Sequence, residues 1–387
     1  MTLRPYAVVM DGRLETGLEL ELDEDGTIAS ISTSSSSAEP YVLCAAFVNA
    51  HSHLEYRGLQ GGITAKGYFE WIKAVTLAKK KQSGAQVRED CLLAAAENKQ
   101  TGVAYIAEHS DRPFAGEAMA AHGLEGVIFQ EVITFAEHEA PAERLALATA
   151  NMAANSKHFD GEVHINPHTP WTVDEATLRA IAEAGGRVSI HVAESIHEND
   201  YIERNEGPIA AAAQEVGIRR THGQRAVPYL ESLGYLRSGV QFVHCCDIDQ
   251  DEVLSLAGAA VSVAHCPRSN EALDCPRAPV REMLDAGVLV GLGLDSAASS
   301  GPIDMFAEMR AAVSVAEMRG APVTPEEAWR MATTMGASSL GLAGWDIAEG
   351  ARTALVRIDV TGATSTSDLI ALADPSKVSW VSTRVRS

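Results

Sequence analysis

The middle of the chain alternates short apolar runs with longer stretches in which apolar residues recur at helical spacing. Each short run is bounded by turn-forming or charged residues, which is typical of a buried strand. Helical patterns such as 88–99, 141–154 and 173–184 lie between most of the runs. Parallel β/α units produce this alternation, and eight of them predict a (β/α)8 or TIM barrel of the α/β class. The predicted strands are 41–48, 103–107, 126–132, 162–166, 187–192, 240–244, 260–264 and 288–293.

Both ends of the chain carry a different pattern. Near the N-terminus Leu18, Leu20 and Leu22 alternate with glutamates, and near the C-terminus strand-like runs at 354–360 and 378–381 flank a turn-rich stretch. Neither fragment is large enough to bury a core alone. We therefore expect residues 1–46 and 346–387 to form one small β-sandwich domain beside a catalytic barrel of residues 47–345.

Composition restricts the partners and the compartment. The net charge of −21 argues against nucleic acids and anionic membranes, because the field of the protein repels phosphates. No apolar run reaches the roughly 18 residues of a membrane span, and no signal-peptide core is evident, so a cytoplasmic location is expected. The six cysteines contain no CxxC pair, which favours free buried thiols. We expect a small-molecule substrate, and a homo-oligomer is compatible with the sequence.

The first predicted strand ends in two histidines, His51 and His53, separated by one residue. In an extended backbone such residues point to the same side, so both rings are placed to bind one metal ion. A single His-X-His is weak evidence, since two solvated loop histidines give the same pattern. Ligands at the ends of later strands are needed to support the metal site.

Further polar residues close later apolar runs. The fifth strand ends in His191-Val-Ala-Glu194, His244 ends the sixth and Asp295 follows the eighth. The carboxyl ends of barrel strands share one face, where active sites lie. Any one of these side chains is equally well explained by hydrogen bonds that it makes separately from the others. Their convergence on one face favours a metal site.

These residues resemble the amidohydrolase superfamily, specifically its mononuclear deaminase branch. The resemblance implies that His51, His53, His191 and Asp295 bind the metal, that Glu194 is the proton shuttle, and that His244 and Asp295 assist the attacking water. The fourth strand offers no lysine for carbamylation, so one divalent ion, zinc or Fe(II), is implied. The matching motifs are His51-Ser-His53, Pro167-His168-Thr169-Pro170, His191-Val-Ala-Glu194, His244, His265-Cys-Pro-Arg-Ser-Asn270 and Gly293-Leu-Asp295-Ser296.

Flanking segments resemble aminodeoxyfutalosine deaminases and adenosylhomocysteine/methylthioadenosine deaminases. The expected function is thus metal-dependent hydrolytic deamination of an amino-substituted heterocycle, an adenine nucleoside such as aminodeoxyfutalosine. Tyr56 stands where relatives commonly have a small serine, and Leu294 stands where they have threonine, which leaves the substrate open. The alternatives are a same-fold hydrolase acting on a pterin, cytosine or triazine, including a C–Cl bond, and a non-catalytic interaction protein.

Four residues are candidate substrate contacts: Glu55, Trp71, His168 and Glu198. Glu198 belongs to a long insertion, 195–239, between the fifth and sixth strands, where it is placed to cover the substrate. The alternatives are a salt bridge for Glu55, core packing for Trp71 and a surface ion pair for Glu198. The segment Arg268–Asn270 is expected to brace the loop after the seventh strand.

Overall fold

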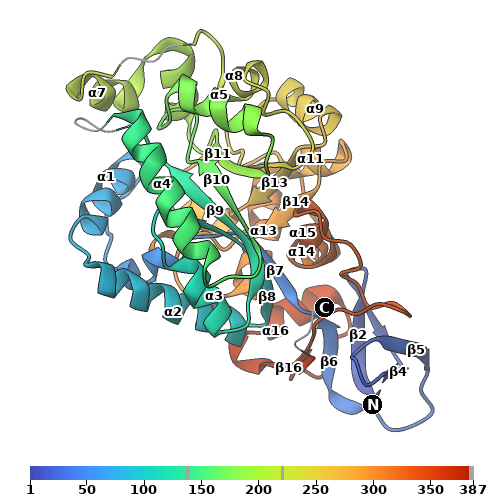
Figure 1. Ribbon diagram of the computed structural model, residues 1–387. Coiled ribbons are helices and arrows are strands. Elements are labelled where there is room, and N and C mark those ends of the chain that lie inside the picture. The colour runs from blue at the N-terminus through green and yellow to red at the C-terminus, as the bar shows by residue number, and fades with distance from the viewer. Residues whose placement is uncertain (136–139, 219–221, 383–387) are drawn as a thin grey trace.

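The computed structural model describes residues 1–135, 140–218 and 222–382. Its larger body contains two four-stranded parallel sheets, with strand orders β10-β9-β8-β7 and β11-β12-β13-β14 (Figure 1). Each of the eight strands overlaps one of the predicted runs. They are β7 (Phe47–Ser52), β8 (Val103–Ser110), β9 (Glu125–Val132), β10 (Glu162–Pro167), β11 (Val188–Val192), β12 (Val240–His244), β13 (Ser262–His265) and β14 (Val290–Leu292).

The edges of the two sheets meet at both ends of the strand order. Beyond β14, Asp295 forms a parallel bridge with Ser52 of β7. Between β10 and β11, the Ser189 backbone N–H donates to Asn166 Oδ1 at 2.8 Å, and the His191 N–H donates to the His168 carbonyl at 3.1 Å. These contacts bring the carboxyl ends of all eight strands to one side of the body.

Helices cover the outer faces of the sheets, and several of them begin at side-chain caps. Asp174 accepts from the Thr177 N–H, so α5 begins at Glu175 and not at Val173, where the helical pattern starts. Capping boxes at Ser83 and Asp249 begin α2 and α9. The long helices are α1 (Tyr68–Lys79), α2 (Gly84–Gln100), α4 (Pro141–Ser156), α5 (Glu175–Ala184), α9 (Gln250–Gly258), α13 (Met305–Arg319) and α14 (Pro325–Ala332). Among the described helices, none is long and apolar enough to cross a membrane.

The long insertion after β11 forms short helices at the carboxyl ends of the strands, drawn at the top of Figure 1. They are α6 (Ile196–Asn199), a π-helical turn (Asp200–Arg204), α7 (Gly207–Glu215) and α8 (Ala226–Ser232). Asn199 ties two of them together, because its Oδ1 accepts from the Ala226 N–H at 2.8 Å. The insertion therefore lies on the side of the body where the catalytic residues are expected.

The apolar run 41–48, predicted as one strand, forms two. β6 (Glu39–Ala45) belongs to a second sheet, and β7 begins at Phe47. At the break, the Ala46 N–H donates to the Ala354 carbonyl and the Trp345 Nε1–H donates to the Ala46 carbonyl, both at 2.8 Å. These bonds satisfy the backbone N–H and C=O groups of Ala46, where the chain passes from one sheet to the other. No polar side chain is needed there, so the sequence stays apolar across the break.

Strands from both termini make up a smaller β-rich body, at the lower right of Figure 1. Its five-stranded sheet has the order β16-β15-β6-β2-β3, and a three-stranded sheet has the order β1-β4-β5. The remaining strands are β1 (Thr2–Leu3), β2 (Pro5–Met10), β3 (Arg13–Thr16), β4 (Leu18–Leu22), β5 (Ile28–Thr33), β15 (Leu355–Ile358) and β16 (Val378–Ser382). The turn-rich stretch between the last two strands contains a helix that the pattern did not predict, α16 (Thr366–Leu372), capped by Ser365.

One apolar cluster joins the two ends of the chain. Leu355 of β15 packs with residues of the N-terminal strands, among them Val8, Leu20 and Leu43. All four side chains are fully buried. The domain limits 1–46 and 346–387 remain a prediction, and this cluster offers a direct test of it.

Leu355→Ala should lower the free energy of unfolding by about 2–5 kcal/mol, because it leaves a cavity between the two terminal segments. Urea denaturation followed by circular dichroism measures the change. Leu372→Ala is the matched control, since that side chain is 46% exposed, and it should change stability little. Equal stability of both variants would contradict a shared terminal core.

Candidate metal centre and active site

Four buried side chains surround one point at the carboxyl ends of the strands. His51 and His53 lie at and just beyond the end of β7, His191 lies in β11, and Asp295 follows β14. The Nε2 atoms of His53 and His191 are 3.3 Å apart. Asp295 Oδ1 is 3.6 Å from His51 Nε2 and 3.8 Å from His53 Nε2. The structure therefore brings together the four residues that the sequence nominated as ligands.

The hydrogen bonds of these histidines leave their inward nitrogen atoms free. His53 Nδ1 donates to the His109 carbonyl at 3.0 Å, and His191 Nδ1 donates to the His168 carbonyl at 2.9 Å. With the proton on Nδ1, the lone pair of Nε2 points into the cluster. His51 is fully buried, and neither of its ring nitrogens has a hydrogen-bond partner in the part of the chain that the structure describes. Buried polar atoms of this kind need a partner, and a divalent cation fits the set.

Burial also sets the protonation of the cluster. It lowers the pKa of His51 and His53 well below the usual histidine value, and it lowers that of His191 to about 4. Burial alone would raise the pKa of Asp295, but the surrounding histidines, His244 first, outweigh it and the pKa falls. Neutral imidazoles and an ionised carboxylate are the forms that bind metal ions.

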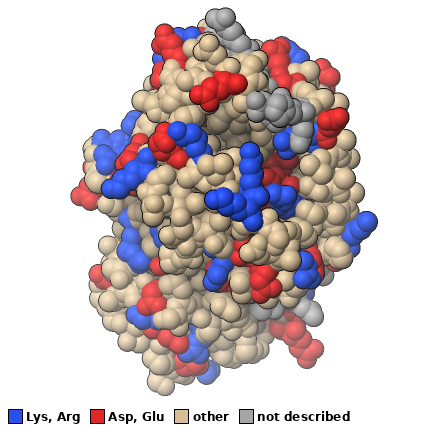
Figure 2. Space-filling view, turned by 90° about the vertical axis from the view of Figure 1, so that its left-hand side faces the viewer, with Lys and Arg blue, Asp and Glu red and all other residues tan. Residues whose placement is uncertain are grey.

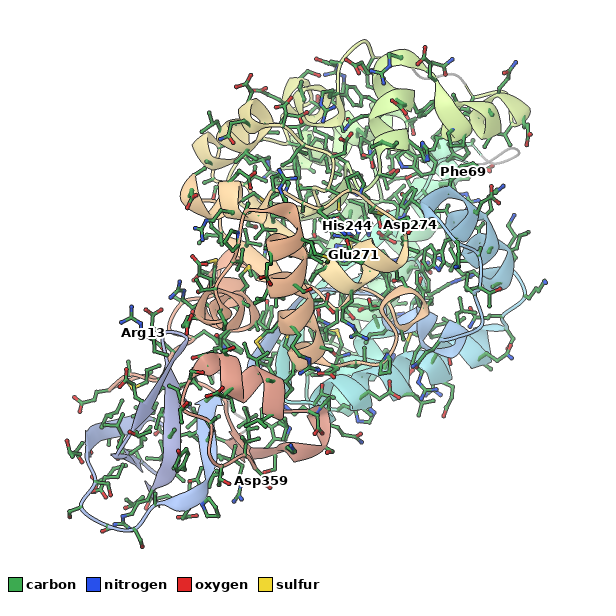
Figure 3. All side chains as sticks on the ribbon, turned by 180° about the vertical axis from the view of Figure 1, so that it is seen from behind. Arg13, Phe69, His244, Glu271, Asp274 and Asp359 are labelled. Carbon is green, nitrogen blue, oxygen red and sulfur yellow. The ribbon has the colours of Figure 1, made fainter. Side chains whose placement is uncertain are left out.

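Glu194 and His244 lie beside this cluster. His244 Nε2 is 3.6 Å from Glu194 Oε1, and the side-chain nitrogen and oxygen atoms that these two residues and Asp295 offer lie within 4.8 Å of one another. His244 Nδ1 donates to Asn270 Oδ1 at 2.8 Å, which orients the ring. Burial, followed by the charge of Asp295, raises the pKa of Glu194 well above its usual range. In Figure 3 His244 lies inside the larger body, whereas Arg13 and Asp359 mark the smaller one.

The backbone at these strand ends is strained. Ala193 has φ 49°, His244 has φ 72° and Asp295 has φ 52°, all in the left-handed region that residues with a Cβ rarely adopt. Such conformations persist where the surrounding contacts enforce them, and they concentrate at functional sites. Here each one re-aims the chain at the point where a strand delivers its polar side chain.

A pocket opens onto the cluster and is walled by α1. Tyr68, Trp71, Ile72 and Val75 of that helix form one side, and Leu273 contributes an apolar side chain from the loop after α10 (Pro267–Ala272). The polar floor carries Glu194, His244 and Asp295. The pocket thus combines an apolar, partly aromatic wall with polar side chains beside the cluster.

The predicted substrate contacts divide into two pairs. Trp71 and His168 line the pocket. Glu55 and Glu198 are not among its described lining residues: Glu55 accepts from Ser110 Oγ at 2.7 Å, and Glu198 is fully buried. The bracing expected of Arg268–Asn270 is visible in the Asn270 contact with His244 and in the Arg268 N–H bond to Glu308 Oε1 at 3.0 Å.

Sequence reasoning missed Lys79, which lies beside the pocket. Lys79 lines it and binds Asp111 at 2.9 Å, as well as the hydroxyl of Tyr56. The Tyr56 ring stacks on His53 with centroids 4.9 Å apart and 10° between planes. Lys79 is the first of three consecutive lysines, a run that reads as the solvated end of a helix, so the pattern gave no signal.

The face shown in Figure 2 carries basic and acidic side chains interspersed among neutral ones. No broad single-sign area is visible on this face. The excess of acidic residues is therefore not concentrated on the side of the molecule that contains α1 and α2.

The residues of this site fall within a region that matches a known protein family. The profile described as Amidohydrolase family matches residues 42–381. The chain belongs to the amidohydrolase family. A 5-methylthioadenosine/S-adenosylhomocysteine deaminase of Haloquadratum walsbyi is 30% identical over 331 residues, which cover 82% of this chain and 71% of the relative. A 5'-deoxyadenosine deaminase of Methanopyrus kandleri is 28% identical over 335 residues, or 81% of this chain and 74% of the relative. The resemblance noted in the sequence is confirmed.

Solved structures of amidohydrolase type share the fold. An adenosine deaminase from Xanthomonas campestris with bound zinc superposes with a TM-score of 0.84 at 21% identity, covering 99% of this chain and 91% of that one. The aminofutalosine deaminase of Helicobacter pylori, in complex with methylthio-coformycin, gives 0.81 at 16% identity, covering 98% and 99%. At these identities the likeness establishes the fold.

Proposed function

We propose that this protein is a metal-dependent hydrolytic deaminase of adenine nucleosides. The observation that carries the proposal is the convergence of Glu194 and His244 on the cluster of three histidines and Asp295, at one pocket. The two relatives described above are named as deaminases of 5'-deoxyadenosine and of 5-methylthioadenosine and S-adenosylhomocysteine. These names support adenine nucleosides as the substrate class. All side chains needed for hydrolysis are in place, which argues against a non-catalytic role.

We further propose that His51, His53, His191 and Asp295 hold one divalent ion, zinc or Fe(II). The absence of lysine in β10 supports a single ion over a pair bridged by a carbamylated lysine. When bound, such an ion supplies Lewis acidity that brings the pKa of water from about 15.7 to near 7. The zinc in the Xanthomonas structure supports zinc as the first choice.

Three side chains of this protein have separate roles in the reaction. Glu194 takes a proton from the attacking water and delivers it to a ring nitrogen of the adenine, because it is the carboxylate that lines the pocket beside His244 and is not one of the proposed ligands. His244, fixed by Asn270, stabilises charge that develops on the attacking oxygen. Asp295 orients the water, and a second proton transfer to the exocyclic amine releases ammonia.

The fold proposal is an eight-stranded closed barrel with a small β-sandwich made by both chain ends. The bridge from Ser52 to Asp295 and the bonds between β10 and β11 support closure. The apolar cluster around Leu43 and Leu355 supports the sandwich. Closure explains how side chains from β7, β11, β12 and β14 reach one point.

A substrate panel tests the function. Purified, zinc-loaded protein is offered 5'-methylthioadenosine, S-adenosylhomocysteine, 5'-deoxyadenosine, adenosine and aminodeoxyfutalosine, together with a pterin, cytosine and a chlorotriazine. We expect ammonia release from at least one adenine nucleoside with a kcat/KM in the common range of about 10⁴–10⁸ M⁻¹s⁻¹. Release of chloride, or of ammonia from the non-purines alone, would overturn the substrate class.

A further inference from the structure

Glu131 is a buried carboxylate that the mechanism above does not use. It lies in β9, and its side chain is fully buried. Its Oε1 atom is 3.6 Å from His191 Nδ1, on the side of the ring away from the proposed ion. Neither carboxylate oxygen has a hydrogen-bond partner among the described residues.

The surroundings of Glu131 are unfavourable for a negative charge. Lys79 attracts it, but Asp111, Glu55 and Asp295 are carboxylates that repel it. Lys79 itself is already engaged by Asp111 at 2.9 Å and lies 3.5 Å from Glu55. A buried carboxylate with so little compensation destabilises a fold unless another positive charge lies nearby.

The proposed metal centre lies on the far side of the His191 ring and can supply a positive charge near Glu131. His191 Nδ1 already donates to the His168 carbonyl at 2.9 Å, and Glu131 approaches the same N–H. A carboxylate behind a ligating histidine fixes the ring and increases the basicity of its other nitrogen. An ion held at His191 Nε2 would in turn compensate the charge of Glu131.

We propose that Glu131 is a positioning residue of the metal centre, which holds His191 toward the ion and stabilises the bound cation electrostatically. The inference rests on His191 being a ligand, as proposed above, but not on the identity of the substrate. The affinity for the ion then depends on a residue that contacts neither the ion nor the pocket.

Glu131→Gln keeps the size of the side chain and removes its charge. Zinc affinity, measured by competition with a chromophoric chelator, should fall about 10- to 100-fold, the range typical of such partners. The melting temperature of the metal-free protein should change little, because neither carboxylate oxygen makes a hydrogen bond among the described residues that the fold would lose. Glu131→Asp retains the charge and should bind zinc more tightly than Glu131→Gln.

Glu252→Gln is the matched control. Glu252 is a 4% exposed carboxylate of α9 that pairs with Arg225 at 3.0 Å. Its replacement should lower the melting temperature and leave zinc affinity unchanged.

Wild-type zinc affinity in Glu131→Gln would overturn the inference, as would a metal-free melting temperature lowered as far as in Glu252→Gln. If Glu131→Gln does not yield folded protein, zinc affinity in Glu131→Asp decides: a loss of 100-fold or more would overturn the role of the charge. Failure of the wild type to bind zinc at all would instead remove the proposed function.

Discussion

Glu194→Gln should retain the metal and bind the substrate, yet lose at least about 10²- to 10⁴-fold in turnover. The amide preserves the shape of the side chain but cannot exchange protons with water and the purine ring. Glu194 lies 3.6 Å from His244 and lines the pocket floor, so both addition and ammonia loss depend on it. Single-turnover kinetics with the substrate identified in the panel measure the effect.

The control for this variant is the same change at Glu252, on α9, where Glu252→Gln should leave kcat within a few-fold of wild type. Metal content and substrate affinity are measured on both proteins. Near-wild-type turnover in Glu194→Gln with full metal content would refute the shuttle assignment. Loss of the metal would show instead that Glu194 is a ligand.

His51→Ala and Asp295→Ala should each empty the metal site and abolish turnover while the body remains folded. His51 offers two buried nitrogens that have no hydrogen-bond partner among the described residues, and Asp295 Oδ1 lies within 4 Å of two of the imidazoles. Elemental analysis should find about one equivalent of metal in the wild type and close to none in the variants. Circular dichroism should show unchanged secondary structure.

The melting temperature gives a second readout of the same change. Added zinc should raise it for the wild type, because a ligand that binds only the folded state stabilises that state. Added zinc should not raise it for either variant. Two tightly bound equivalents in active wild-type protein would contradict the single-ion site.

Much of the fold and of the ligand set was readable from the chain. The apolar runs located the strands, and the polar residues that close them, His51, His191, His244 and Asp295, meet because parallel strands deliver their ends to one face. The break at Ala46 was not readable, since the residues on both sides of it are equally apolar.

Residues whose role depends on the packing of distant segments could not be recognised from the sequence. Glu131 stands inside an apolar strand and becomes meaningful only when β9 is placed near His191 of β11. Lys79 belongs to a run of lysines, and only the docking of α1 turns it toward Asp111. Glu198 occupies a helical turn that reads as solvated, but the folded insertion buries it completely.

The central claim is that this chain removes the amino group of an adenine nucleoside by metal-dependent hydrolysis. One measurement tests it most directly: ammonia and the 6-oxopurine product are quantified together from 5'-methylthioadenosine, with zinc-loaded and chelator-stripped protein. The account predicts equal amounts of the two products with zinc, no turnover after stripping, and recovery when zinc is returned. Full activity in the stripped protein, or no product from any adenine nucleoside with the loaded one, would contradict it.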